Sequence, residues 1–170
     1  IDEHGSMSAE LISDTSRADI DRWVNKYPAE QKQSAVMAAL RIVQDQNGGH
    51  LTQELMDAVA GYLQMPAINV YEVATFYSMY EHKPQGKHKL CVCTNISCML
   101  RNSKQVVDHL EDKLGIGFGE ITEDGLFSLK EVECLGACVN APVMQVGEHY
   151  HEHLDPEKID KLLDELRKEG

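Results

Sequence analysis

The chain has 170 residues, of which 42% are hydrophobic and 26% charged, enough for one medium domain or two small ones with packed cores. The formal net charge is −12 and neither half is basic, which argues against nucleic-acid binding, because that needs Lys and Arg to neutralise phosphates. With no apolar run near the roughly 18 residues that span a bilayer and no secretory signal, the sequence predicts a cytoplasmic or membrane-peripheral protein without direct membrane insertion.

The N-terminal part of the chain shows helical periodicity. Residues 1–7 contain Gly5-Ser6-Met7 and resemble a cloning scar, so they are left out of the fold prediction. Residues 8–82 are predicted to form a helical domain, because their apolar residues recur at helical spacing. A short helix before Pro28 is expected to turn three residues inward: Ile20, Trp23 and Val24.

Three further helices are expected in this domain. The first begins at Pro28 and ends at Asn47-Gly48-Gly49, and its apolar face consists of Ala35, Val36, Ala39, Leu40 and Val43. Thr52 is the expected N-cap of the second, which carries Leu55, Val59 and Leu63. Pro66 opens the third, which carries Val70, Val73, Ala74 and Tyr77.

A second domain is predicted for residues 83–170, after Pro84 and Gly86 interrupt the helical pattern. Its expected elements are a strand at 87–93, a helix at 98–114 ended by Gly115, a turn at Asp124-Gly125 and a strand after it, with a bulge or strand end near residues 130–131. A hairpin around residues 147–148 and a helix capped by Asp155-Pro156 complete it. The predicted fold class is α+β (α/β), with β-α-β-β-α order in this domain.

Five cysteines carry the chemical signal of the sequence. In a reducing compartment they are not expected to form structural disulfides, and an odd number fits four ligands plus one spare. Cys93 and Cys98 form a C-x4-C pair, and Cys134 and Cys138 form a C-x3-C pair. Each pair follows a predicted strand, where a loop lets two side chains converge. The spare residue, Cys91, is expected to be a small core residue.

Four thiolates suit either a tetrahedral zinc ion or an iron–sulfur cluster. The C-x4-C spacing matches the plant-type [2Fe–2S] pattern better than a zinc knuckle, and no histidine stands at ligand spacing beside either pair. We therefore expect a [2Fe–2S] cluster, with a structural zinc module as the alternative. Around the ligands, Gly136 leaves room for a backbone N–H, and three polar side chains are possible donors to sulfur: Thr94, Asn95 and Ser97.

Apolar residues beside the cysteines predict a contact with a partner protein. Ile96, Met99 and Leu135 are expected on this surface, whereas Leu100 and Val139 are expected in the chain's own core. The end of the helical domain offers a second candidate contact, with four large side chains: Phe76, Tyr77, Met79 and Tyr80.

Two other functions fit the sequence less well. Residues 52–77 have the form of a helix-turn-helix, but the recognition helix would be residues 70–79, which contain Glu72 and no Lys or Arg. A disulfide oxidoreductase needs a C-x-x-C motif, and neither cysteine pair has that spacing.

The cysteine-containing segments resemble a known family. Residues 92–101 (VCTNISCMLR) and 132–143 (VECLGACVNAPV) are similar to motifs of the E subunit of NADH–quinone oxidoreductase (respiratory complex I), the NuoE-type thioredoxin-like [2Fe–2S] ferredoxin family. Residues 70–77 and 122–127 also look like parts of that family. The resemblance runs from about residue 15 to the end of the chain, and the cysteine pattern does not depart from it.

The resemblance implies a helical domain followed by a thioredoxin-like domain whose cluster ligands are Cys93, Cys98, Cys134 and Cys138. It implies a one-electron carrier with no catalytic residue of its own, in a complex peripheral to the inner membrane (on the matrix side if organellar). It also implies a partner flavoprotein that binds FMN and NADH. Similar modules occur in NAD-dependent formate dehydrogenases and NAD-coupled hydrogenases.

The sequence agrees with hydride chemistry on a partner subunit and one-electron transfer on this chain. The sequence has no Gly-rich phosphate loop after a strand, so we do not expect it to bind a dinucleotide. NADH delivers two electrons as hydride, whereas a lone cluster accepts one, so a flavin must stand between them.

Overall fold

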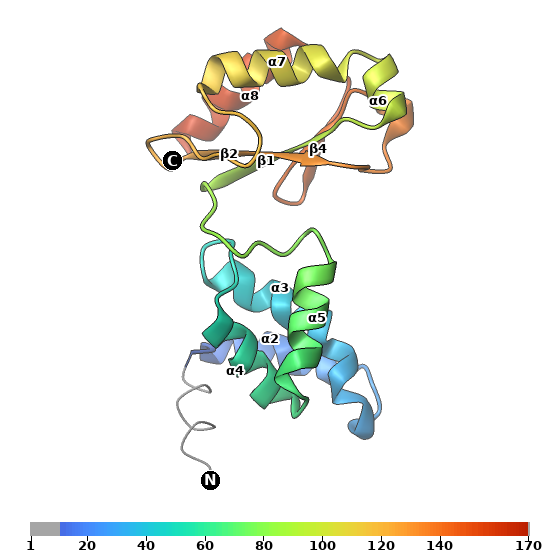
Figure 1. The fold of residues 1–170 in the computed structure, drawn as a ribbon, viewed down its shortest axis with the longest axis vertical. Coiled ribbons are helices and arrows are strands. Elements are labelled where there is room, and N and C mark those ends of the chain that lie inside the picture. The colour runs from blue at the N-terminus through green and yellow to red at the C-terminus, as the bar shows by residue number, and fades with distance from the viewer. Residues whose placement is uncertain (1–10, 170) are drawn as a thin grey trace. The chain divides into compact units, whose positions relative to one another are not determined.

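The computed structural model describes residues 11–169, and the proposed cloning scar at residues 1–7 lies outside this range. The chain divides into two compact units, with the boundary between Pro84 and Gln85 (Figure 1). None of the described helices is long and apolar enough to cross a membrane.

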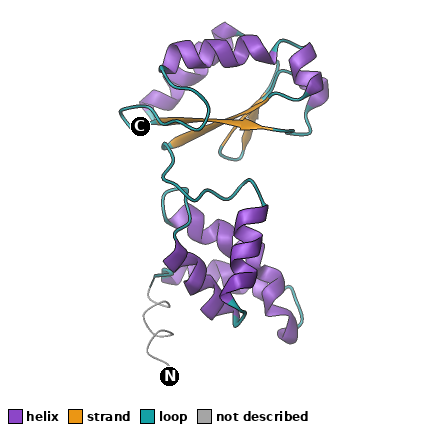
Figure 2. Ribbon diagram, in the orientation of Figure 1, coloured by secondary structure: helices purple, strands orange, loops and turns teal. Residues whose placement is uncertain are grey.

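The first unit is helical (Figure 2). Its elements are α2 (Asp14–Val24), the 3-10 helix η1 (Ala29–Ala35), α3 (Val36–Gln46), α4 (Gln53–Leu63) and α5 (Ala67–Phe76). The predicted caps are present, because the Thr52 side chain accepts a hydrogen bond from the Leu55 N–H, and α5 begins directly after Pro66. Buried side chains from all of these elements form one core, including Ile20, Leu40, Val43, Val59, Leu63 and Val70.

Three details of the first unit differ from the prediction. The helix expected from Pro28 starts as the 3-10 helix η1, and the α-helix begins only at Val36, because Gln31 has non-helical dihedral angles. Trp23 was expected inward but is 41% exposed, and the Lys26 ammonium lies 3.6 Å from the centre of its ring. Tyr77 follows the end of α5 and is also exposed. The Lys26 ammonium on the face of the Trp23 ring stabilises this exposed position by a cation–π interaction.

The second unit contains a four-stranded sheet in the order β2-β1-β3-β4. The strands are β1 (His88–Cys93), β2 (Phe127–Val132), β3 (Met144–Val146) and β4 (His149–His151). The helices are α6 (Ile96–Leu100), α7 (Ser103–Leu114), the 3-10 helix η2 (Cys138–Asn140) and α8 (Pro156–Lys168). β1 pairs with β2 in parallel and with β3 antiparallel, and β3 and β4 form the predicted antiparallel hairpin.

The core of this unit lies on one face of the sheet, where α7 and α8 pack (Figure 1). Leu90 and Val92 of β1 and Phe127 and Leu129 of β2 meet the apolar faces of the two helices. The predicted cap of α8 is present, because the Asp155 side chain accepts a hydrogen bond from the Lys158 N–H at 2.8 Å. The fold class predicted from sequence is therefore correct.

The predicted element order of the second unit needs correction. The observed order is β-α-α-β-β-β-α, which has one helix more than predicted and counts both strands of the predicted hairpin. The single helix expected over 98–114 is two helices, because Asn102 between them has a left-handed φ of 69°. Of the bulge or strand end expected near residues 130–131, the strand end is found, since β2 pairs with β1 without interruption from Phe127 to Val132 and ends there.

Candidate functional site

The parallel pairing of β1 and β2 brings the two cysteine segments to one edge of the sheet. Cys93 is the last residue of β1 and Val132 the last of β2, and the two are register partners. The carboxyl ends of parallel strands lie at the same edge, so the segments that follow them leave from neighbouring points. Backbone hydrogen bonds tie the site together there, from the Thr94 N–H to the Val132 carbonyl (3.4 Å) and from the Cys93 N–H to the Val143 carbonyl (3.2 Å).

The four cysteines form an inner pair and an outer pair. Cys93 and Cys98 are buried and pack in a small apolar cluster with Ala141 and Val143. Leu135 and Ala137, which lie between the two cysteines of the outer pair in sequence, pack against the same cluster. Cys134 and Cys138 themselves are exposed. The C-x3-C segment therefore covers the inner pair with its apolar residues and leaves its thiols accessible.

The electrostatics of Cys98 show that three of these thiols share one environment. The pKa of the Cys98 thiol is raised to about 11, first by burial, then by a hydrogen bond with Cys93 and by the negative charges of Cys93 and Cys138. The protonated form of the Cys98 thiol is therefore favoured while no cation is present. A bound metal reverses this preference, because a coordinating thiol is deprotonated by the charge of the ion.

The exposed pair is organised by backbone hydrogen bonds. The N–H of Gly136 donates to the Cys134 sulfur at 3.3 Å, and Gly136 has a positive φ of 72°, which suits a residue without a side chain. The Tyr150 hydroxyl on β4 donates to the Leu135 carbonyl at 2.8 Å. Sequence reasoning found the glycine but missed Tyr150, which lies 15 residues from Leu135 and carries no local signal of this contact.

Thr94 and Asn95 of the C-x4-C segment form hydrogen bonds with groups other than the cysteine sulfurs. Thr94 was a candidate donor to sulfur, but its hydroxyl donates to the Glu131 carboxylate at 2.6 Å. The Asn95 side chain caps α6 by accepting a hydrogen bond from the Ile96 N–H at 2.7 Å. The helix expected to start near Cys98 therefore starts at Ile96 and contains Cys98. Cys91, the spare cysteine, is buried within β1, as expected.

The donor set fits a binuclear cluster. A structural zinc ion takes four ligands on one centre, whereas in a [2Fe–2S] cluster four thiolates are divided between two irons. The two cysteine pairs supply the four thiolates that the second arrangement needs.

Several large apolar side chains close to the cysteines in the sequence are exposed. Leu100 and Val139 were expected in the core, but they are 75% and 88% exposed. Ile96 and Met99, which were expected at the surface, are exposed as well. The prediction for Leu100 and Val139 was wrong, because both lie in short helices: α6 has five residues and buries only Cys98, and η2 has three residues and buries none.

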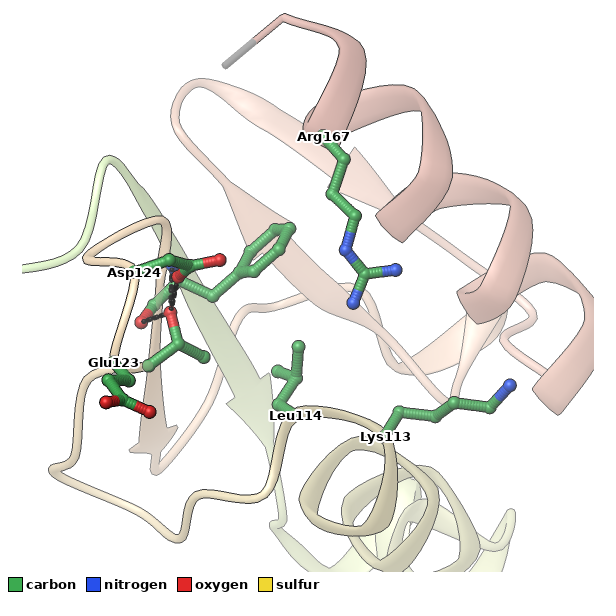
Figure 3. A pocket seen from close by; sticks show the side chains of 7 residues that line it. Lys113, Leu114, Glu123, Asp124 and Arg167 are labelled. Atoms are coloured by element: carbon green, nitrogen blue, oxygen red, sulfur yellow. Dashed lines mark hydrogen bonds between the residues drawn. The ribbon is translucent and has the colours of Figure 1, made fainter.

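One hollow in the described part of the chain lies away from the cysteines. Its volume is about 430 Å³, and it lies where β2 begins, among the turn at residues 122–124 and the ends of α7 and α8 (Figure 3). Its charged groups are engaged nearby: Asp124 with Thr122 (2.6 Å), Lys113 with Asp160 (3.0 Å) and Arg167 with Asp164 (3.4 Å). The cysteines at the other end of β2 remain the candidate site.

Comparison with known proteins assigns the chain to a family. A family model described as "Thioredoxin-like [2Fe-2S] ferredoxin" matches residues 20–167. The chain belongs to this family. The E subunit of NADH-quinone oxidoreductase from Rickettsia bellii (strain RML369-C) is 49% identical over 144 residues, which cover 85% of this chain and 86% of that protein. The same subunit from Rickettsia felis (strain ATCC VR-1525 / URRWXCal2) is 49% identical over 142 residues, covering 84% and 85%.

A solved structure shares the fold. An NAD⁺-reducing [NiFe]-hydrogenase in the air-oxidized state contains a chain that matches 79% of this one with a TM-score of 0.67 and 19% sequence identity. The match spans 23% of that hydrogenase chain. At this identity, the likeness supports the architecture of the family member described here and nothing about its chemistry.

Proposed function

We propose that this member of the thioredoxin-like [2Fe–2S] ferredoxin family binds one [2Fe–2S] cluster on Cys93, Cys98, Cys134 and Cys138. The observation that carries the proposal is the convergence of the two cysteine segments at the carboxyl ends of the paired strands β1 and β2. When bound, the cluster supplies one-electron chemistry at a potential that the protein tunes through hydrogen bonds and exposure.

The proposed role is that of the one-electron carrier subunit of an NADH dehydrogenase of the complex I type. The names of the Rickettsia relatives, at 49% identity over most of the chain, support this role. FMN and NADH would be bound by a partner flavoprotein, because NADH delivers a hydride that a flavin can convert into single electrons. The complex would lie at the cytoplasmic face of the inner membrane, or on the matrix side in an organelle.

The unequal burial of the four cysteines suggests how the chain exchanges electrons. Cys93 and Cys98 anchor the site from inside, whereas Cys134 and Cys138 are exposed and mark the side that a redox partner can approach. Ile96, Met99, Leu100 and Val139, which lie close to the four cysteines in the sequence, are exposed as well. Apolar side chains around a redox centre are protected from water when a partner subunit covers them.

A second candidate is the equivalent subunit of an NAD-coupled hydrogenase or formate dehydrogenase. A chain of an NAD⁺-reducing hydrogenase shares the fold of this chain, which is why the hydrogenase is kept as a candidate. The protein chemistry of the cysteines would be the same in either complex. To separate these candidates, the tagged chain is purified from its host, and the flavoprotein and the other subunits that co-purify with it are identified.

Analysis of anaerobically purified protein tests the cluster. We expect about two irons and two sulfides per chain, a brown colour and charge-transfer absorption in the visible range. A colourless protein that contains one zinc per chain would support the structural zinc alternative instead and would refute the proposed function.

A further inference from the structure

One peptide unit between the exposed cysteines is hydrogen-bonded at both ends. Its carbonyl, from Leu135, accepts a hydrogen bond from the Tyr150 hydroxyl at 2.8 Å. Its N–H, from Gly136, donates to the Cys134 sulfur at 3.3 Å. The C=O and N–H of a planar trans peptide point in opposite directions. The bond from Tyr150 therefore also sets the direction in which the N–H points.

The backbone around this peptide can rotate unless something holds it. Gly136 has a φ of 72°, and a Cβ built on it would meet no atom within 4 Å. Neither a side chain nor close packing therefore restrains that side of the peptide. Tyr150 belongs to β4, whose pairing with Gln145 of β3 fixes the position of the tyrosine backbone. The Tyr150 hydroxyl thus links the sheet to the exposed loop by a hydrogen bond.

We propose that Tyr150 is a positioning residue for the Cys134 thiolate. Its hydroxyl aims the Gly136 N–H at the sulfur and polarises the peptide that lies between them, because hydrogen bonds in series strengthen one another. The inference rests on the proposed function. An N–H directed at a ligand sulfur favours the more negative, reduced state of an anionic cluster, so the Tyr150 hydroxyl raises its reduction potential.

The test compares two Tyr→Phe substitutions in the full-length, cluster-loaded protein. Tyr150→Phe removes the hydroxyl and keeps the ring. Tyr62→Phe is the matched control, because its hydroxyl donates at the same distance of 2.8 Å to Asp21 in the other unit. Both variants should retain the iron and sulfide content of the parent protein, since neither removes a ligand.

The reduction potential is the deciding measurement. At a fixed solution potential, the ratio of reduced to oxidised cluster in Tyr150→Phe should fall roughly threefold, as expected when a hydrogen bond of ordinary strength is weakened. Tyr62→Phe should match the parent. A Tyr150→Phe protein with a full cluster and the parent potential overturns the proposal, and so does an equal shift in both variants.

Gly136→Ala supplies a second route to the same peptide. Its side chain has space, but the positive φ is strained for alanine, so the N–H should turn away from Cys134 and the potential should fall. Because both substitutions act through one peptide, the double variant should shift by less than the sum of the single shifts. Additive shifts would show that Tyr150 acts independently of the Gly136 N–H and would refute the proposed relay.

A measurement on iron-free full-length protein separates this inference from the proposed function. In Tyr150→Phe, but not in Tyr62→Phe, the chemical shift of the Gly136 amide proton should depend more steeply on temperature, as for a weakened hydrogen bond. An unchanged dependence overturns the positioning role even if Tyr150→Phe fails to load a cluster. A parent protein that binds no [2Fe–2S] cluster refutes the proposed function, and this measurement still decides the role of Tyr150.

Discussion

Cys93 lies directly opposite Val132 in the parallel pair of β1 and β2, and each is the last residue of its strand. One backbone hydrogen bond beyond this pair, from the Thr94 N–H to the Val132 carbonyl, closes the edge of the sheet. Cysteine pairs that lie 35 residues apart in the chain are therefore neighbours in space. The fold thus gathers both cysteine segments at one edge of the sheet.

Replacing any one of Cys93, Cys98, Cys134 or Cys138 by alanine should remove or cripple the cluster, because one of the two irons would lose one of its two thiolates. Cys91→Ala is the matched control, since Cys91 is buried within β1 and is not a proposed ligand. Iron and sulfide content per chain is the measurement. Normal content in two or more of the four ligand variants would contradict the assignment.

Reduction with dithionite should place one unpaired electron on each cluster, visible by low-temperature electron paramagnetic resonance. Ligation by four thiolates favours a low potential, nearer about −400 mV than the range of clusters with two histidine ligands. His88 begins β1 at the end remote from Cys93, so it is not a candidate ligand. A measured potential above zero would show that the ligand set is wrong.

The isolated chain should neither oxidise NADH nor bind FMN tightly, because its sequence lacks a Gly-rich phosphate-binding loop. Activity with NADH and ferricyanide, measured with and without the partner flavoprotein, checks this expectation. Substantial turnover by the chain alone would place the hydride chemistry in this subunit. It would contradict the proposal that a partner flavoprotein oxidises NADH.

The exposed apolar residues beside the cysteines should become protected when the flavoprotein binds. Val139→Ser is expected to weaken binding roughly tenfold or more if this side chain is fully covered, because most of it is now in water. Ile68→Ser, an exposed position in the first unit, is the control. Hydrogen exchange of the chain alone and in the complex locates the contact. Protection confined to segments far from both cysteine loops would refute this interface.

Acidification should remove the stabilising effect of Asp160. The carboxylate accepts from His109 at 2.7 Å and pairs with Lys113 at 3.0 Å, and these contacts lower its pKa, with the His109 hydrogen bond as the main cause. A depressed folded-state pKa stabilises the fold above the unfolded-state pKa, and the contribution is lost as the pH falls through the folded value.

Asp160→Asn should therefore lower the melting temperature at neutral pH and converge with the parent protein in acid. Thermal unfolding across this pH range is the measurement. Asp164→Asn, which affects an exposed pair with Arg167 on the same helix, is the control. A difference between Asp160→Asn and the parent that persists unchanged in acid would exclude the electrostatic explanation.

Local interactions account for what the sequence predicted well. Thr52 and Asp155 cap their helices through bonds to residues three positions later, and Gly115 ends α7 with a left-handed backbone. The spacing within each cysteine pair is also a local feature, because the two cysteines of a pair lie within a few residues of each other. These features depend on short stretches of chain, so they are readable without the fold.

Only the tertiary structure decided the features that depend on distant residues. It exposed Trp23, Leu100 and Val139, which apolar character alone had assigned to the core, because whether a face is buried depends on which elements pack against it. It also set Tyr150 against the Leu135 carbonyl. That contact requires the β3–β4 hairpin and the strand order of the sheet, which no local pattern encodes, since strand pairing joins segments far apart in the chain.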